Sequence, residues 1–534
     1  MMRIAAISFT PPELYGLQLG LLNILVDLRS LGNVHTEVHF VDDSQRIDGK
    51  SFDVILMSVV NSLQYPLIFA ALKKMDVPFH SVDRTSEYPF VVVGGIGLPN
   101  PEPLAEFIDI AVTSPSSESL ISIVRHLSKQ TPSERDRKSR LWGLTDIPDI
   151  YIPSLVNPEF NNDHTIKSIK SRYELHFNKD KTRPRFYCSS DGNGIVSILM
   201  NTGCRKKCYF CALTWYWHYV EADLVNIKRE VSNLENRNTN TLIVNSASIT
   251  QHSEFDAIIE YLRKSGHRIV MGSLRADELN DEKGSRLASL NCTDHSITEY
   301  SGLSCVDSRM LTFGIETPSR DLLRLLGKNM DPQLVERNIK MMISKGLNRI
   351  GLYFMIGLPH ERKDDRMAII NFVKNIADEN HNNIRGLSIR TNPLVPTPCT
   401  PMQRCEYEDV ENIERHLTEL TNGFDDILRN SHIRQSSSIH VLNPGTYLYE
   451  TIAYRGDRRT GGLLLELYRR GIKLESLDKP TIENLLTEFG LPCYDFFRRR
   501  INPSEILPWQ LLIGDTVIVS EREFLTRLAS VQSR

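Results

Sequence analysis

Three cysteines within eight residues constrain this chain more than any other feature. Cys204, Cys208 and Cys211 stand in the run NTGCRKKCYFCAL, so the spacing Cys-x3-Cys-x2-Cys supplies three thiolates from one tight loop. Iron–sulfur clusters are held by cysteine thiolates, usually four of them. A four-iron cube with only three protein ligands keeps one iron open, where a substrate or cofactor can bind. We therefore expect a catalytic iron–sulfur cluster at this loop.

Two other interpretations of the three cysteines remain open, a structural zinc site and unrelated buried thiols. A structural zinc site needs a fourth ligand close by and usually pairs its cysteines as CxxC. The nearest extra candidates, His218 and Cys188, do not stand at a zinc-like spacing. The chain has nine cysteines, and those outside the triad are scattered. This usage is typical of the reducing cytoplasm rather than of a disulfide framework.

Strand and helix patterns alternate over residues 1–130, from the apolar run RIAAISF to the amphipathic run SSESLISIVRHLSK. Such alternation predicts a doubly wound parallel sheet in a Rossmann-like domain, which makes the fold class α/β. Ligands of these sheets bind at the carboxyl ends of the strands. Gly94 and Gly95 follow the apolar strand FVVV, where glycine lets the backbone approach a ligand closely.

The rest of the chain suggests three more segments. Residues 131–190 are polar and carry turn signals, which predicts a linker. Residues 191–400 alternate again between strands and helices, which fits a closed or partial (βα) barrel with its catalytic parts at the carboxyl ends of the strands. The cysteine loop follows the first of these strands, as that rule requires. Residues 401–534 read as a mostly helical C-terminal domain.

The run CRKKCYFC, with the aromatic Phe210 just before the last cysteine, resembles the cluster motif of the radical S-adenosylmethionine (SAM) enzymes. The resemblance implies a [4Fe–4S] cluster whose open iron is chelated by the amino and carboxylate groups of SAM. It also implies that one electron from the reduced cluster cleaves SAM to methionine and a 5′-deoxyadenosyl radical. Phe210 would then flank the adenine of SAM.

The same resemblance assigns SAM contacts along the barrel strands. Ser246 and Ser248, in NSAS, stand where many members show Gly-Gly-Glu and receive the methionine amino group. The glycines and the glutamate are missing here, so the two serines offer only hydrogen-bonding groups, and a helix N-cap is the alternative. Arg275, in SLRADEL, suits the carboxylate of SAM, with an ordinary salt bridge to Asp277 or Glu278 as the alternative.

Two later strands complete the implied SAM site. Glu316 and Ser319, in GIETPS, stand where the family places a glutamate that contacts SAM or neighbouring polar groups. Ile356 and Gly357, in LYFMIGLP, resemble the strand whose backbone meets adenine, although a buried strand followed by a turn explains them equally well.

The N-terminal segment resembles the cobalamin-binding domain that precedes many radical SAM enzymes. The resemblance rests on VVVGGIGLPNPEPLAEFIDIAV, and it implies that Gly94 and Gly95 adjoin a cobalamin. The Asp-x-His-x-x-Gly motif, whose histidine ligates cobalt in other cobalamin proteins, is replaced here by SFTPPELYGLQLG. Many radical SAM members also lack that histidine. A vestigial Rossmann-like domain with an empty cleft or a docking role is the alternative.

The order of these motifs resembles a functionally uncharacterised subgroup of the superfamily. The leading hypothesis is cobalamin-dependent methylation of an unactivated carbon by a cytoplasmic enzyme. Cobalamin-assisted rearrangement or cyclisation, a radical enzyme that uses SAM alone, and an Fe–S redox or iron sensor are the alternatives. Expected partners are a small-molecule or peptide substrate and an electron donor such as flavodoxin or ferredoxin. The net charge of −3, with no long basic or apolar run, argues against nucleic-acid and membrane partners.

Overall fold

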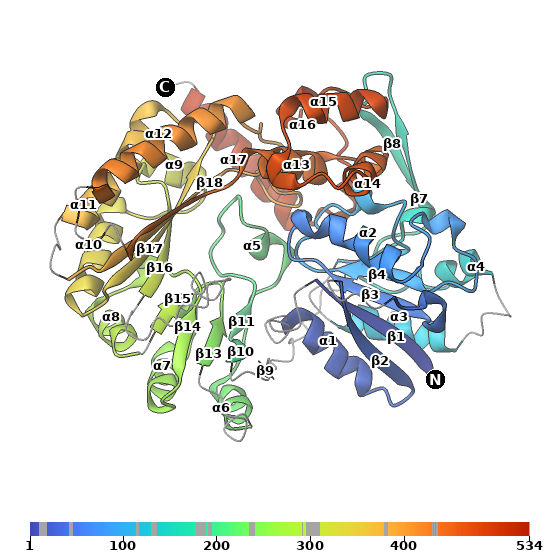
Figure 1. Ribbon diagram of the computed structural model, residues 1–534, viewed down its shortest axis with the longest axis horizontal. Helices are drawn as coiled ribbons and strands as arrows, with labels where there is room; N and C mark the ends of the chain where they lie inside the picture. Colours follow the sequence, from blue (N-terminus) through green and yellow to red (C-terminus); the bar gives the residue numbers. More distant parts are fainter. Residues whose placement is uncertain are drawn as a thin grey trace. The chain divides into compact units, whose positions relative to one another are not determined.

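A computed structural model of the chain describes residues 1–9, 19–41, 46–113, 117–129, 136–177, 188–190, 195–233, 241–290, 292–294, 310–378, 383–429, 431, 433 and 436–532. The chain divides into two compact units (Figure 1). Unit 1 comprises Met1–Arg185, Pro396–Glu406 and Gly445–Ile518, and unit 2 comprises Phe186–Val395, Tyr407–Pro444 and Val519–Arg534. Residues 401–534, which we expected to form one domain, are thus shared between the two units.

Unit 1 contains a six-stranded sheet with the strand order β2-β1-β3-β4-β5-β6. Strands β1 to β5 are parallel and β6 is antiparallel to β5. The order 2-1-3-4-5 is that of flavodoxin-like doubly wound sheets, in which ligands bind where the order reverses, here between β1 and β3. The strands are Met2–Ser8, Val34–Phe40, Val54–Ser58, Phe90–Gly94, Ile110–Val112 and Ile150–Tyr151.

Helices cover both faces of this sheet, which confirms the doubly wound prediction. Alternate strand residues form one apolar cluster with side chains of α1 (Leu19–Arg29), α3 (Glu118–Ser128) and α4 (Arg137–Trp142). On the other side, α2 (Tyr65–Lys74) packs with α14 (Gly461–Arg469), and the ring of Phe69 lies 5.9 Å from that of Tyr468. Because strand side chains point alternately to opposite faces, a fully apolar strand such as FVVV is buried on both.

Within the segment expected to be a linker, residues 136–177 are built into unit 1, whereas Cys188–Ser190 form β9 of unit 2. Strand β6 extends the sheet, and β7 (Val156–Phe160) pairs with β8 (Ile166–Ser171) as an antiparallel hairpin. Arg137, at the start of α4, ion-pairs with the buried Asp109 at 2.7 Å. The segment SFTPPELYGLQLG, which replaces the cobalt-ligating motif, lies mostly outside the described residues.

Unit 2 contains two largely parallel sheets, a five-stranded sheet of order β15-β14-β13-β10-β9 and a four-stranded sheet of order β16-β17-β18-β19. A parallel bridge between Leu274 and Phe313 joins the two sheets. The strands, in chain order, are Cys188–Ser190, Ile195–Leu199, Thr241–Asn245, Arg268–Met271, Cys292–Asp294, Met310–Glu316, Arg349–Ile356, Gly386–Pro393 and Ser438–Val441.

Helices between these strands follow the predicted pattern. In α7 (Phe255–Lys264) the buried residues are spaced as on one helical face, namely Phe255, Ile258, Ile259 and Leu262. The other helices of unit 2 are α5 (Ala212–Tyr216), α6 (Leu224–Ser232), α8 (Asp281–Ala288), α9 (Arg320–Leu325), α10 (Pro332–Ser344), α11 (Lys363–Asp378), α12 (Val410–Arg429) and most of α17 (Asp515–Gln532). The α/β class with parallel sheets is confirmed, although α8, β15 and β19 were not predicted.

The C-terminal region is mostly helical, as predicted. Besides α12, α14 and α17 it contains α13 (Pro444–Arg455), α15 (Lys479–Glu488) and α16 (Tyr494–Arg498). In unit 1 the turn after α13 is tied to the connection between β4 and β5, since Arg458 forms an ion pair with the buried Glu102 at 2.8 Å. Within the described residues, no helix is both long enough and apolar enough to cross a bilayer.

Candidate active site

The cysteine loop leaves the five-stranded sheet of unit 2 at the carboxyl end of β10. Its two ends are held together by β11 (Asn201–Thr202), which pairs antiparallel with β12 (Val220–Glu221). Gly203 turns the chain into the loop with φ of 59°, and a Cβ at this position would lie 2.6 Å from the carbonyl oxygens of Trp217 and His218. The closed base of the loop therefore needs glycine at this position.

The three thiols lie close to one another in this loop. Cys208 is buried, whereas Cys204 and Cys211 are partly exposed. The backbone N–H of Cys211 donates to the carbonyl of Cys208 at 3.2 Å, which closes a turn between the second and third cysteine. Each of the other two sulfurs influences the ionisation of Cys211. The side chain of Cys188, an alternative ligand, is outside the described residues.

The surroundings of the thiols combine burial with two cations. Burial raises the pKa of Cys208, and the positive charges of Lys328 and Arg275 partly oppose that rise. Burial also raises the pKa of Cys211, to about 11. Iron binding must therefore displace thiol protons, and the cations beside Cys208 stabilise the thiolate that remains.

The donor set suits an iron–sulfur cube. Among the described residues, no group of three or more His, Cys, Asp or Glu side chains could hold a metal ion. A four-iron cube binds each cysteine at a different corner, so its ligands lie farther apart than those of one ion. Three soft thiolates in one loop, next to the guanidinium of Arg275, are the type of ligand that holds such a cluster.

Neighbouring segments clamp the cysteine loop through Tyr209. Its backbone N–H donates to the carbonyl of Leu326 at 2.8 Å. Its ring makes an edge-to-face contact with Phe524 of α17, with the ring centroids 5.7 Å apart, and the guanidinium of Arg527 lies 5.3 Å from the ring. The indole N–H of Trp215 donates to the carbonyl of Cys208 at 2.8 Å. The loop is therefore fixed by contacts at Cys208 and at Tyr209.

Arg275 lies at the cluster, with most of its hydrogen-bonding capacity already used. It is 8% exposed, and its guanidinium binds both carboxylate oxygens of Asp277, at 2.9 and 3.2 Å. It also lies 3.6 Å from Glu278. The remaining Nη1 is 3.8 Å from the sulfur of Cys208. Both interpretations of Arg275 thus describe part of its environment: it forms the acidic ion pairs, but it is buried and points at a predicted cluster ligand.

Glu316 ends β16 in a left-handed backbone conformation, with φ of 65°. Such a conformation is costly for a residue with a Cβ and is typical of functional sites. Its carboxylate pairs with the buried Lys328 at 2.7 Å, and the same ammonium donates to the carbonyl of Gly314. Ser319 is the N-cap of α9, and its backbone N–H donates to the hydroxyl of Thr317. Phe210 is partly exposed beside Cys211.

Ser246 and Ser248 follow β13, on the same edge of the sheet as the cysteine loop. The hydroxyl of Ser246 donates to the side-chain oxygen of Asn201, which precedes that loop. The buried Ser248 lies 2.7 Å from the hydroxyl of Thr250 and 3.3 Å from Glu278. Ser248 is also the N-cap of a short 3-10 helix, although its side chain does not bond the helix backbone. Both hydroxyls keep lone pairs that can accept one more hydrogen bond.

Close packing accounts for the glycines that we assigned to cofactors. A Cβ at Gly95 would lie 2.2 Å from the carbonyl oxygen of Val59, and one at Gly94 would lie 3.2 Å from Val112. A Cβ at Gly357 would lie 2.9 Å from Ile413, and Ile356 is fully buried in β17. Packing therefore favours glycine at the three glycine positions, whether or not a ligand is bound.

Two polar residues of this region were missed by sequence reasoning. The amide of Gln251 lies 3.9 Å from the sulfur of Cys204. The buried Asn338, in α10, donates to the carbonyls of Ala276 and Leu279, at 2.8 and 3.0 Å, and so fixes the turn that carries Arg275. Neither residue stands in a motif, so only the folded arrangement identifies them.

Comparison with known families decides the classification. Residues 198–373, which contain the three cysteines and the strands around them, match the radical SAM superfamily. The chain belongs to the radical SAM superfamily. Residues 33–153 match the N-terminal region of radical SAM proteins. The cofactors of the superfamily are a [4Fe–4S] cluster and SAM.

Individual relatives are distant. An uncharacterized protein of Methanocaldococcus jannaschii, MJ0966, is 23% identical over 399 residues, which cover 70% of this chain and 73% of the relative. The cobalamin-dependent SAM radical enzyme OxsB, solved with aqua-cobalamin and SAM, aligns with 98% of this chain and 66% of its own at 12% identity and a TM-score of 0.50. The radical SAM methyltransferase TsrM from Kitasatospora setae aligns with 73% of each chain at 14% identity and a TM-score of 0.47.

Proposed function

We propose that this radical SAM enzyme binds cobalamin and methylates an unactivated carbon of a small-molecule or peptide substrate. In this proposal Cys204, Cys208 and Cys211 hold the cluster, and the strand ends of unit 2 bind SAM. The observation that carries the radical half is the buried Arg275 beside the sulfur of Cys208, at the strand edge where the other predicted SAM residues also lie.

The residues of unit 2 would bind SAM, orient it and exclude water from it. When bound, the cluster and SAM together supply a strongly oxidising carbon radical that removes hydrogen from the substrate. Arg275 would orient the carboxylate of SAM through Nη1, while Asp277 fixes the guanidinium plane. Glu316, held by Lys328, would accept hydrogen bonds from SAM, and Ser246 and Ser248 would offer their free lone pairs to its amino group.

Unit 1 supports the cobalamin half through its topology. The strand order reverses between β1 and β3, and doubly wound sheets bind ligands in the crevice at such a point. Directly after β3, the side-chain oxygen of Asn61 is buried and, within the described part of the chain, has no hydrogen-bond partner. The neighbouring Val60 is 60% exposed. An unsatisfied buried oxygen next to an exposed apolar side chain is what a large amphipathic ligand would cover.

The residues after β3 therefore fit cobalamin, and Asn61 and Val60 would hold it. When bound, cobalamin supplies a methyl group to the substrate carbon. The OxsB structure, with which this chain shares its fold, contains aqua-cobalamin and SAM. Packing against Val59 explains Gly95, so the glycines do not contribute to this argument. We also propose that the enzyme works in the cytoplasm, where reducing conditions would keep Cys204, Cys208 and Cys211 available as cluster ligands.

The first test separates the radical half from the cobalamin half. The protein is purified anaerobically, its cluster is reconstituted, and SAM is added under reducing conditions. Formation of 5′-deoxyadenosine or of a SAM-derived methylated product, absent from a Cys208→Ala variant, supports the radical enzyme. Intact SAM beside a fully loaded, reduced cluster would favour a redox or iron sensor.

The second test measures cobalamin retention. Hydroxocobalamin is added to the same protein, which is then desalted and analysed for cobalt and for its visible spectrum. We expect near-stoichiometric cobalt without a histidine-ligated spectrum. An Asn61→Leu variant should retain less cobalt while its iron content is unchanged. No retained cobalt beside an intact cluster would contradict the cobalamin half and leave an enzyme that uses SAM alone.

A further inference from the structure

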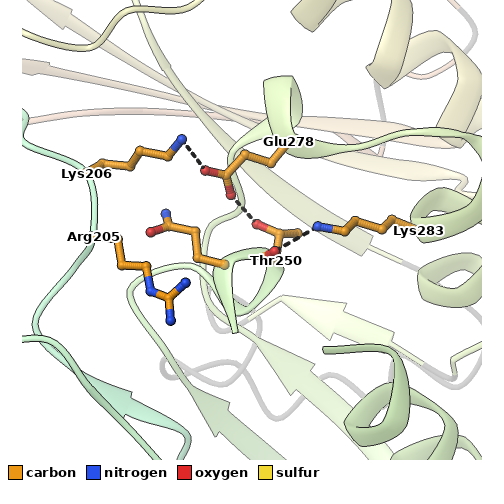
Figure 2. A pocket seen from close by; sticks show the side chains of 6 residues that line it. Arg205, Lys206, Thr250, Glu278 and Lys283 are labelled. Atoms are coloured by element: carbon orange, nitrogen blue, oxygen red, sulfur yellow. Dashed lines mark hydrogen bonds and ion pairs between the residues drawn. The ribbon is translucent and has the colours of Figure 1, made fainter. Parts of the chain in front are cut away.

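A basic cleft of about 430 Å³ opens beside the cysteine loop in unit 2. Figure 2 shows the cleft, with the loop residues on one side and the segments after β13 and β14 on the other. This volume lies within the range of ligand-sized clefts. We call it the cluster-loop cleft, and it is lined by Arg205, Lys206, Thr250, Gln251, Glu278 and Lys283.

The cluster-loop cleft is positively charged on a molecule that is negative overall. Its lining carries three cations and one carboxylate. Lys206 pairs with Glu278 at 2.9 Å, and Lys283 donates to the carbonyl of Thr250 at 2.9 Å. Arg205 pairs with Glu221 at 2.9 Å, and its side chain is still 51% exposed. Because the whole chain carries a net charge of −3, this local excess of positive charge would direct an acidic partner to this face.

The lining of the cleft also touches a predicted cluster ligand. The amide of Gln251 lies 3.9 Å from the sulfur of Cys204, and Arg205 and Lys206 are the two residues that follow this cysteine. Gln251 thus lines the cleft and also contacts the sulfur of Cys204. Electron transfer slows steeply with distance, so a reductant bound in the cleft would have a short path.

We propose that the cluster-loop cleft is the docking site of an acidic electron-transfer protein, which passes one electron to the cluster past Gln251 and Cys204. The proposal rests on the radical SAM function. In this step the donor protein is oxidised by one electron, and the cluster is reduced from the 2+ to the 1+ state. No bond forms or breaks, and the donor then dissociates. The partner is defined by its acidic surface and its low-potential one-electron centre.

The experiment measures cluster reduction and does not depend on turnover of SAM. Reconstituted protein is mixed anaerobically with reduced flavodoxin, and bleaching of the cluster absorbance gives a second-order rate constant. An Arg205→Gln/Lys283→Gln double variant removes two cations without touching a cysteine. The matched control is Arg263→Gln/Lys264→Gln, which removes one exposed Arg and one exposed Lys from α7 in the same unit.

We expect the cleft variant to slow reduction by flavodoxin about 5- to 10-fold at low salt and to flatten the dependence on ionic strength. Reduction by photoreduced 5-deazariboflavin, a small uncharged reductant, should be unchanged, as should both rates in the α7 control. If reduction by flavodoxin is slowed equally in the two double variants, the proposal is overturned, because the result shows only a general effect of charge.

A small-anion site is the competing explanation of the cleft. Inorganic phosphate is therefore compared with sodium chloride at equal ionic strength. The docking proposal would be overturned by three results together. Phosphate would inhibit reduction by flavodoxin more strongly than sodium chloride, the cleft variant would no longer bind phosphate, and flavodoxin would reduce that variant at the wild-type rate when phosphate is absent. The iron content, the sulfide content and the electron paramagnetic resonance spectrum are measured first, to establish that a [4Fe–4S] cluster has assembled. A wild-type protein that assembles no [4Fe–4S] cluster would refute the proposed function itself rather than the position of the docking site.

Discussion

One methyl group at Gly327 would test how the cysteine loop is held. Gly327 follows α9 with φ of 67°, and a Cβ built there would lie 2.8 Å from the carbonyl oxygen of Lys207 and 3.2 Å from the ring of Tyr209. Gly266 has φ of 74° in the same unit, but a Cβ there would meet nothing within 4 Å. The two glycines form a matched pair, with the same backbone demand and different surroundings.

The expected free-energy changes differ between the two positions. Alanine in the left-handed conformation costs about 1–2 kcal/mol at either site. At Gly327 the contact with Lys207 and Tyr209 adds overpacking, which typically costs about 1–3 kcal/mol. A domain of about 150–250 residues loses about 2–4 °C of Tm per kcal/mol. Gly327→Ala should therefore lower the Tm by roughly 2–12 °C more than Gly266→Ala.

Strain at Gly327 would reach the cluster, because the displaced carbonyl of Lys207 immediately precedes Cys208. If the overpacking acts on the cluster-bound loop, about 1–3 kcal/mol corresponds to roughly 5- to 150-fold weaker cluster binding. Iron and sulfide contents after anaerobic reconstitution, with thermal unfolding of each variant, measure both effects. We expect Gly266→Ala to load like the unchanged protein. Equal iron content and equal Tm loss in the two variants would refute the idea that this contact positions the loop.

Three further outcomes are expected. Phe524→Ala, which empties a fully buried site beside Tyr209, should cost about 3–5 kcal/mol and speed bleaching of the cluster by oxygen, whereas Phe524→Leu should do much less. Asn338→Ala removes the side-chain donor to the carbonyls of Ala276 and Leu279, of which the first keeps a bond from the backbone N–H of Leu279; it should cost about 1–3 kcal/mol and weaken SAM binding in equilibrium dialysis, and unchanged binding would argue against a positioning role. Burial raises the pKa of Glu450 to about 7 from 4.5, so the folded protein keeps a proton that the unfolded chain loses. Stability should fall as pH rises through this window, by on the order of 3 kcal/mol, and Tm measured from about pH 5 to pH 8 should lack that decline in Glu450→Gln.

Local patterns were sufficient for most elements of the fold. The amphipathic spacing of α7 and the apolar run of β4 lie within short windows, so the sequence predicts both directly. The strand β19 (Ser438–Val441) was missed in a region read as helical, because only four residues pair, and they pair with β18 of the same sheet. The alternation of strands with helices also predicts that Ser246, Arg275 and Glu316 lie at the same end of the barrel, since the carboxyl ends of its parallel strands face one way.

Contacts between distant segments could not be predicted. The packing of Phe524 on Tyr209 joins the last helix to the cysteine loop, and no pattern in either segment encodes the other. Gly95 shows that one local pattern can have two explanations. A glycine after a strand suggests close approach by a ligand, but here the carbonyl of Val59, directly after the neighbouring strand β3, makes the close approach. Sequence identifies a position that needs a small residue without identifying its neighbour.

Glu316 shows why the site is better understood as a set of constraints than as a motif. Its left-handed backbone costs about 1–3 kcal/mol, and the surrounding structure must supply that energy. The ion pair with the buried Lys328 contributes part of this energy. The same ammonium also binds the carbonyl of Gly314, so it links the backbone at the end of β16 to the side chain of Glu316. Lys328 directly follows Gly327, whose backbone abuts Lys207 and Tyr209 of the cysteine loop. Gly327 and Lys328 thus contact both the cysteine loop and the carboxylate of Glu316. A substitution at Glu316 should therefore alter the cysteine loop, and a substitution in the loop should alter the position of Glu316.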